Sequence, residues 1–408
     1  MIAARPAAKC RVMALIGTRP EAIKMAPVIY RLLANPAFET CVCVTGQHRE
    51  MLAPLLEFFG LEARYDLKVM GRGEGLSLLT AAVLAEMDRV LAEFKPDRLL
   101  VQGDTTTAFA GALAAFYRRI PVAHVEAGLR TGSMDAPWPE EANRRLLAVL
   151  SDLHFAPTDL ACAQLTTEGV HRGAIHLTGN TVVDALMAVR ARLKSDATLL
   201  QVIEREFRYL DPAKRLILVT SHRRESFGDG LDRICEAVKR LACLDGVEIV
   251  YPVHLNPQVK GPVHRYLGGL GNVHLVEPLN YPHFVYLMQR AALILTDSGG
   301  IQEEAPSLGT PVLVMRDVTE RTEALAKGLV ELVGTDVAAI VEAAQRVLRG
   351  GRGAGLVADR QNPFGDGHAS DRIVSILEEL WTRGASADVP RHAAGAPGSG
   401  NEKYAKKA

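Results

Sequence analysis

The chain has 408 residues, of which 48% are hydrophobic and 23% charged, and its formal net charge is zero. This length favours two domains of roughly 150–200 residues each. The neutral balance gives no electrostatic reason to bind nucleic acid or an anionic membrane, and no apolar run reaches the roughly 18 residues of a membrane span. Residues 1–9 contain no apolar stretch before a cleavage site, so a signal peptide is not predicted.

In the first half of the chain, short apolar segments alternate with helical patterns. Pro20 suits the first turn of the helix after the first strand, whereas Pro27 should kink that helix. Alternating strands and helices favour a parallel sheet that helices cover on both faces. The strands predicted for this sheet are residues 12–16, 41–44, 98–101, 122–125, 153–155 and 175–177.

A second series of the same kind begins after residue 212. A long helical stretch over 182–208 precedes it, and we place the hinge between the two halves near the start of this stretch. Further helices are expected to end at 348 and to cover 371–381, and the tail has a disordered linker's composition. The strands predicted for the second series are residues 216–220, 247–251, 273–276, 293–295 and 312–314.

Six cysteines lie within or beside apolar segments. Cys41 and Cys43 have the spacing that places both side chains on one face of a strand. The sequence contains no Cys-x-x-Cys pair and no cluster of Cys and His, so neither a zinc site nor a disulfide framework is predicted. Free buried thiols are typical of cytoplasmic proteins, and we expect this protein in that compartment.

Three acidic residues stand where α/β chains usually place working groups. Asp104 and Glu126 each follow a predicted strand, and Glu140 lies in a Pro-Trp-Pro-Glu-Glu sequence. The carboxyl ends of parallel strands meet at one edge, so these carboxylates should line one crevice. Clustered carboxylates raise one another's pKa, which suits proton transfer to and from carbon. The alternative is separate helix caps and surface charges, because Asp is a favoured N-cap.

The segment 296–304 (Thr-Asp-Ser-Gly-Gly-Ile-Gln-Glu-Glu) follows a predicted strand and opens a predicted helix. Glycines and a serine at a helix N-terminus offer free N–H groups and a positive dipole end to an anion. Glu304 lies one turn further, where it could accept both hydroxyls of a ribose. The alternative is an ordinary Ser-capped helix. No P-loop motif or Gly-x-Gly-x-x-Gly fingerprint occurs, so a dinucleotide cofactor is not predicted.

Basic residues follow other predicted strands. His222 and Arg223 come after the first strand of the second series, although a surface loop is the commoner explanation of such a cluster. Arg316 and Arg321 follow another strand, and Arg19 follows the first strand of the chain. Arginine favours phosphate because its planar group donates in a fork. The two halves therefore predict a cleft for a nucleoside diphosphate attached to a group that undergoes proton transfer.

Eight ordered motifs carry a resemblance to a known family. They lie at residues 17–24, 46–52, 103–107, 124–132, 137–144, 222–228, 252–257 and 296–321. Through them the chain resembles the bacterial non-hydrolysing UDP-N-acetylglucosamine 2-epimerases from about residue 11 to about residue 371.

The resemblance implies an α/β fold with two Rossmann-like, doubly wound parallel-sheet domains that face each other across a cleft, the glycosyltransferase-B-like arrangement. The implied domains are residues 1–181, with the carboxylates, and residues 182–365, which bind UDP. A C-terminal helix over 366–383 would return to complete the first domain, and residues 384–408 would form a disordered tail.

The resemblance also implies interconversion of UDP-GlcNAc and UDP-ManNAc without a metal or nicotinamide cofactor, supplying ManNAc for cell-surface polysaccharide. Anti elimination of UDP would give 2-acetamidoglucal, and re-addition would deliver a proton to the opposite face of C2. The residues that match the catalytic groups are Asp104, Glu126, Glu140 and His222, and the choice of base among the carboxylates stays open. The residues that match nucleotide-sugar contacts are Arg19, Lys24, Phe284, Ser298, Gly299, Gly300, Glu304 and Arg321.

Bacterial members also bind a second UDP-GlcNAc as an activator and are commonly dimeric, so both properties are expected. The residues that match the effector pocket are Gln47, His48, Arg223 and His254. Without the resemblance, His254 would be interpreted as a hydrogen-bonded core histidine. Leu279 departs from the family, because close relatives often carry Gln there near the uracil.

Three alternative functions remain at this stage. They are a hydrolysing relative that releases ManNAc and UDP, a retaining glycosyltransferase of the same fold, and an inactive nucleotide-sugar-binding regulator. The matched effector residues argue against the hydrolase, and a transferase would not need three carboxylates on one wall. The intact catalytic set argues against the regulator.

Overall fold

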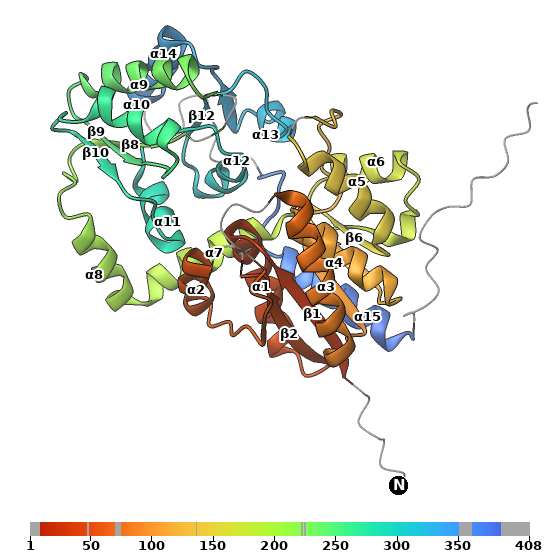
Figure 1. Ribbon diagram of the computed structural model, residues 1–408. Helices are drawn as coiled ribbons and strands as arrows, with labels where there is room; N and C mark the ends of the chain where they lie inside the picture. The colour runs from red at the N-terminus through yellow and green to blue at the C-terminus, as the bar shows by residue number, and fades with distance from the viewer. Residues whose placement is uncertain are drawn as a thin grey trace, which may run out of the picture.

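The computed structural model describes residues 9–46, 49–69, 75–135, 137–221, 223, 226–350 and 361–384. Within these ranges two parallel sheets form the framework, each flanked by helices (Figure 1). This arrangement confirms the predicted fold class.

The first sheet has seven described strands in the order β3-β2-β1-β4-β5-β6-β7. Every neighbouring pair is parallel. Its strands are β1 (Cys10–Ile16), β2 (Phe38–Val44), β3 (Tyr65–Asp66), β4 (Arg98–Gln102), β5 (Val122–Val125), β6 (Leu153–Ala156) and β7 (Ile175–Leu177).

The second sheet has six described strands in the order β10-β9-β8-β11-β12-β13, and these pairs are also parallel. Its strands are β8 (Arg215–Thr220), β9 (Val247–Pro252), β10 (Val273–Val276), β11 (Leu293–Thr296), β12 (Val312–Val314) and β13 (Val330–Leu332).

Helices connect these strands in the right order for two doubly wound sheets. They are α1 (Arg19–Ala34), α2 (Arg49–Phe58), α3 (Leu76–Phe94), α4 (Thr106–Tyr117), α5 (Glu140–Leu150), α6 (Asp159–Thr167), α7 (Thr181–Ser195), α8 (Ala197–Glu206), α9 (Asp229–Ala242), α10 (Pro257–Leu267), α11 (Tyr281–Arg290), α12 (Gly299–Glu304), α13 (Thr322–Ala326), α14 (Val337–Gly350) and α15 (Ala369–Thr382). No helix in the described ranges has the length and apolar composition needed to cross a bilayer.

Several elements differ from the prediction. The stretch 182–208 was expected to be one helix, but α7 and α8 are separated at Asp196. Its side chain accepts a hydrogen bond from the backbone N–H of Leu199 at 3.0 Å, so it caps a new helix. The two-residue β3 and the three-residue β13 were not predicted. The helix α1 contains Pro27 within one continuous element, and the kink expected there stays a prediction.

Helix α7 joins the two halves of the molecule. One buried core extends from the α1 side of the first sheet across α7 to the second sheet. The C-terminal helix α15 packs against α1 and α7 (Figure 1). The backbone N–H of Ser370 at its start donates to Asp184 of α7 at 2.7 Å, and Arg31 of α1 pairs with Asp371 at 2.8 Å. The expected tail, residues 384–408, lies outside the described residues after Gly384.

The expectation of buried thiols holds for four of the six cysteines, because Cys162 is half-buried and Cys243 is exposed. All six cysteines, each in a described range, are free thiols. Cys41 and Cys43 of β2 are buried in the same core, on the face that α3 covers. Burial raises the pKa of the Cys41 thiol to about 11, so it stays protonated and packs as an apolar group.

Candidate active site

The two sheets place their switch points toward one cleft. The strand order reverses between β1 and β4 in the first sheet and between β8 and β11 in the second. Ligands of open α/β sheets bind at such points, outside the carboxyl ends of the strands. The segments that follow these four strands line two adjoining cavities between the sheets.

Glu126 is the most firmly held carboxylate of the cleft. It follows β5 with a φ of 64°, a left-handed conformation that is uncommon for a residue other than glycine. Its carboxylate accepts hydrogen bonds from Lys24 Nζ at 2.5 and 2.7 Å, from Asn180 Nδ2 at 2.9 Å and from Gln102 Nε2. Burial would raise the pKa of Glu126, but the charges of Lys24 and Arg321 hold it below its ordinary value. Glu126 is therefore a fixed anion at neutral pH.

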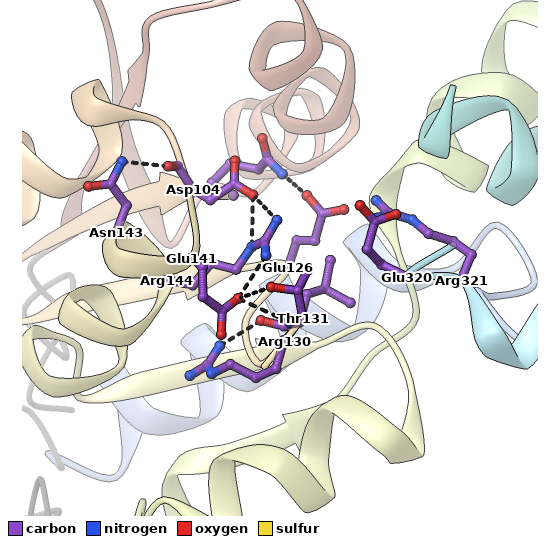
Figure 2. Close-up of polar contacts among 12 residues, drawn as sticks. Asp104, Glu126, Arg130, Thr131, Glu141, Asn143, Arg144, Glu320 and Arg321 are labelled. Carbon is purple, nitrogen blue, oxygen red and sulfur yellow. Dashed lines mark hydrogen bonds and ion pairs between the residues drawn. The ribbon is translucent and has the colours of Figure 1, made fainter. Parts of the chain in front are cut away.

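Asp104 lies on the turn that follows β4. Arg144 donates to its Oδ2 from Nε at 2.9 Å and from Nη2 at 2.8 Å. The same guanidinium donates from Nη1 to Glu141 at 3.0 Å, so Figure 2 shows Arg144 between two carboxylates. The Asp104 side chain is 29% exposed, against 5% for Glu126. Arg144 therefore holds Asp104 through one of its two carboxylate oxygens, and the Asp104 side chain is more exposed to the cavity than that of Glu126.

Glu140 begins helix α5 and completes the set. Its Oε2 is buried and has no hydrogen-bond partner among the described residues. Asp104, Glu126 and Glu140 line one cavity of about 240 Å³, together with Lys24 and Arg321. The three carboxylates therefore line one cavity but differ in how many hydrogen bonds and ion pairs they form with the protein.

Arg321 faces these carboxylates from the second half of the molecule (Figure 2). Its Nε donates to Glu303 Oε1 at 2.8 Å, and its Nη1 lies 3.7 Å from Glu320 Oε2. Gly299 permits this placement, because an added Cβ would lie 3.0 Å from Arg321 Cζ. The Arg321 guanidinium beside Gly299 can therefore form an ion pair with an anion bound in this cavity.

The helix expected after Ser298 is present but short. Helix α12 has six residues and continues as a 3₁₀ turn over Ala305–Leu308. Ser298 occupies its N-cap without a side-chain capping hydrogen bond, so the alternative of an ordinary Ser-capped helix is wrong. A single short helix sums few peptide dipoles, so Arg321 is the stronger source of positive charge.

A larger cavity of about 470 Å³ adjoins the first. Arg19 Nη2 donates to the backbone carbonyl of Leu279 at 2.8 Å, which joins the two walls. Tyr281 donates its hydroxyl to Glu304 Oε2 at 2.7 Å, and burial raises the pKa of Glu304 to about 7. The residues from the predicted nucleotide-sugar set that line this cavity are Arg19, Lys24, Phe284, Ser298, Gly300 and Glu304.

The predicted effector residues are only partly placed. Gln47, His48 and the predicted catalytic His222 lie outside the described residues. Arg223 lines both cavities, and its backbone N–H donates to Asp297 at 2.9 Å. His254 is exposed and lines the larger cavity, so its interpretation as a core histidine is wrong.

Sequence reasoning missed three polar residues of this site. Glu21 is buried beside the small cavity, where it accepts a hydrogen bond from Thr105 Oγ1 at 2.8 Å. Its signal was readable, because Thr18 and Glu21 have the spacing of a capping box. Asn180 and Glu303 join the two walls. Asn180 is a typical N-cap residue and Glu303 lies in the segment 296–304, but no local pattern shows that their side chains meet. Within the described ranges, no group of three or more His, Cys, Asp or Glu side chains is arranged to hold a metal ion.

Comparison with known proteins identifies relatives along nearly the whole chain. The model of a family described as UDP-N-acetylglucosamine 2-epimerase matches residues 31–378. The UDP-N-acetylglucosamine 2-epimerase of Escherichia coli O157:H7 is 53% identical over 369 residues, which cover 90% of this chain and 98% of that protein.

Solved structures show the same similarity. The UDP-GlcNAc 2-epimerase of Neisseria meningitidis bound to UDP-GlcNAc matches with a TM-score of 0.87 and 47% identity, covering 90% of this chain and 100% of that chain. The enzyme of Methanocaldococcus jannaschii in complex with UDP-GlcNAc and UDP matches with a TM-score of 0.77 and 33% identity, covering 90% and 99% respectively.

Proposed function

Because the chain belongs to the UDP-N-acetylglucosamine 2-epimerase family, we propose that it is an isomerase that interconverts UDP-GlcNAc and UDP-ManNAc at C2 of the sugar. The observation that carries this proposal is the cavity in which three carboxylates face the Arg321 guanidinium. Its neighbour, the larger cavity with Phe284 and Glu304, has the lining expected for a nucleoside.

The chemistry requires the loss of the proton at C2 to be coupled to the departure of UDP. This proton is not adjacent to a carbonyl carbon, so direct deprotonation would leave an unstabilised anion. In an elimination, the proton goes to a carboxylate while its bonding pair forms the C1=C2 double bond. The C1–O bond breaks with its electron pair remaining on UDP. Re-addition of UDP at C1, with a proton delivered to the opposite face of C2, completes the epimerisation without redox change.

We assign the departing diphosphate to Arg321 and the backbone of residues 298–300. A donor that meets developing charge in a buried site contributes about 10²–10³-fold to the rate. His222 matches the family's leaving-group partner, and by that resemblance it would also assist the departure of UDP.

The different engagement of the three carboxylates supports different roles. Glu126 is held as an anion by Lys24, so it suits stabilisation of the positive charge that develops at C1 as the C1–O bond breaks. Asp104 and Glu140 have oxygens that the protein engages less, so we assign proton transfer at C2 to this pair.

Separation of the products by anion-exchange chromatography tests the proposed function. UDP-GlcNAc incubated with the protein should give a minority of UDP-ManNAc and little free UDP. Release of UDP and ManNAc in equal, continuously rising amounts would instead assign the chain to the hydrolysing class. No conversion at all would favour an inactive nucleotide-sugar-binding regulator.

A second UDP-GlcNAc bound as an activator is part of the proposal. The larger cavity continues from Phe284 to Arg223 and His254, which supports this assignment. With UDP-ManNAc as the sole starting sugar, trace UDP-GlcNAc should accelerate the reaction, and His254→Ala should remove that acceleration. Equal acceleration in both proteins would contradict the assignment. The expected homodimer is tested by light scattering on the purified protein.

A further inference from the structure

Asn180 lies where the chain passes between the two sheets. It is buried at the N-cap of α7. Its backbone N–H donates at 2.6 Å to the carbonyl of Phe364, which lies on the segment that leads back to α15. The segment before α7 and the segment before α15 lie close together, because a Cβ added to Gly179 would lie 3.2 Å from Gly365 Cα. Any shift of one half relative to the other must therefore be accommodated around Asn180.

Both N–H donors of the Asn180 amide are used, and its oxygen caps a helix. Its Oδ1 accepts from the backbone N–H of Val182 at 3.2 Å, which caps α7. Its Nδ2 donates to Glu126 Oε1 at 2.9 Å and to Glu303 Oε2 at 2.8 Å. A primary amide has two N–H donors, and here each one serves a different carboxylate. An aspartate of the same size could make the cap but neither donation.

The two carboxylates belong to opposite sides of the proposed reaction. Glu126 stands on the sugar side with Lys24, and Glu303 orients the Arg321 guanidinium on the diphosphate side. Two cations and two carboxylates thus form a buried chain across the cleft, with Asn180 at its centre. Among the described residues, Lys24 and Gln102 also donate to Glu126, and His124 is a nearby titratable side chain on β5.

We propose that Asn180 is a positioning residue that fixes Glu126 relative to the Glu303–Arg321 pair. This inference rests on the proposed epimerase function and deepens it. The anion that faces C1 and the cation that faces the leaving diphosphate are held in one geometry by a single amide. Breaking this link should slow the breaking of the C1–O bond more than it weakens the binding of the nucleotide. A misplacement of about 1 Å in a reacting group can cost about 10²-fold in rate.

Two substitutions separate positioning from capping. Asn180→Ser is uncharged and keeps an N-cap acceptor, and Asn180→Asp keeps the size and the cap but adds a carboxylate beside Glu126. Asn362, on the segment before α15, supplies a matched control. Its Oδ1 accepts from the backbone N–H of Phe364 at 3.0 Å, while its Nδ2 donates at 2.7 Å to the Glu303 backbone carbonyl and to Ser307, and to neither carboxylate.

The measurements are kcat, KM and their pH dependence for the unmodified protein and for the Ser and Asp variants at both positions, with thermal unfolding to establish folding. Asn180→Ser should lower kcat by about 10²-fold and change KM and UDP affinity by less than about threefold. Asn180→Asp should also move a limb of the pH profile to higher pH, because a neighbouring negative charge raises the pKa of Glu126. The Asn362 variants should show neither effect.

Three results would overturn the inference. They are equal losses of kcat at both positions, a loss confined to KM, or failure of both Asn180 variants to fold while the Asn362 variants fold. The unmodified protein decides the proposed function separately, because its failure to convert UDP-GlcNAc would reject the epimerase whatever the variants show.

Discussion

The two cavities of the cleft differ in size, in the residues that line them and in their proposed roles. The smaller, of about 240 Å³, is lined by carboxylates, lysine and arginine, whereas the larger, of about 470 Å³, combines Phe284, Leu279 and Ile23 with a few polar groups. Apolar and aromatic surface supplies binding energy for a base, while fixed charges act on bonds that break. We therefore expect substitutions in the small cavity to lower kcat and substitutions in the large one to raise KM.

The largest effect should come from Asp104→Asn in the small cavity. The variant cannot take up a proton at this position, so kcat should fall by about 10³-fold. The dissociation constant for UDP, measured by calorimetry, should change by less than about twofold, because UDP is held mainly by the other cavity.

Asp152→Asn provides the matched control for this substitution. Asp152 is also held by an arginine, Arg98, at 2.7 Å, but it does not line the cavity. Its substitution should leave kcat nearly unchanged. An equal loss of activity in the two variants would mean that Asp104 acts only through the structure.

Phe284→Ala should produce the complementary effect in the large cavity. Stacking of a base on an aromatic side chain contributes about 1–3 kcal/mol, so KM should rise by about 5- to 150-fold with little change in kcat. Steady-state kinetics with UDP-GlcNAc measure both constants, and the exposed Tyr117→Ala is the control. A fall in kcat at unchanged KM would contradict the expectation that the large cavity acts mainly in binding.

A buried acid of the large cavity should make stability depend on pH. Burial raises the pKa of Glu304 from 4.5 to about 7. The folded protein therefore retains a proton that the unfolded chain releases, and this stabilisation is complete below about pH 4.5 and lost as the pH rises through about 7. Its size is up to about 3 kcal/mol.

Urea unfolding at pH 5 and pH 7.5 measures this contribution. Glu304→Gln should lose less stability than the unmodified protein between these two values, and the exposed Glu204→Gln should follow the unmodified protein. Identical differences in all three proteins would show that Glu304 is ionised throughout this window.

The smallest effect should come from Leu279→Gln. The backbone carbonyl of Leu279 accepts from Arg19 at 2.8 Å, and a change of side chain leaves that hydrogen bond possible. We expect KM to change by less than about threefold. A larger fall in KM would show that the side chain at this position recognises the uracil directly.

The parts of this structure that the sequence could predict are those that depend on local pattern. Asp104 and Glu126 were found because each lies just past the end of an apolar strand, and parallel strands bring such residues to one edge. Asp196 was a readable break within the stretch 182–208, since a helix-capping residue stood in the middle of a helical pattern.

The remainder depends on contacts between distant parts of the chain. Glu126, Asn180 and Glu303 are separated by 54 and 123 residues, and neither spacing has a period that a sequence pattern could reveal. The short length of α12 is also set by its surroundings, because the 3₁₀ turn Ala305–Leu308 follows it at once. Such features follow from tertiary packing, which overrides local preference.

The central claim is that epimerisation proceeds by loss and return of the proton at C2, and hydrogen exchange with the solvent tests it most directly. UDP-GlcNAc is incubated with the protein in deuterated water and followed by proton NMR. The proposed mechanism predicts deuterium at C2 of both UDP-GlcNAc and UDP-ManNAc, with little net UDP. Formation of UDP-ManNAc that retains its original hydrogen at C2 would contradict it.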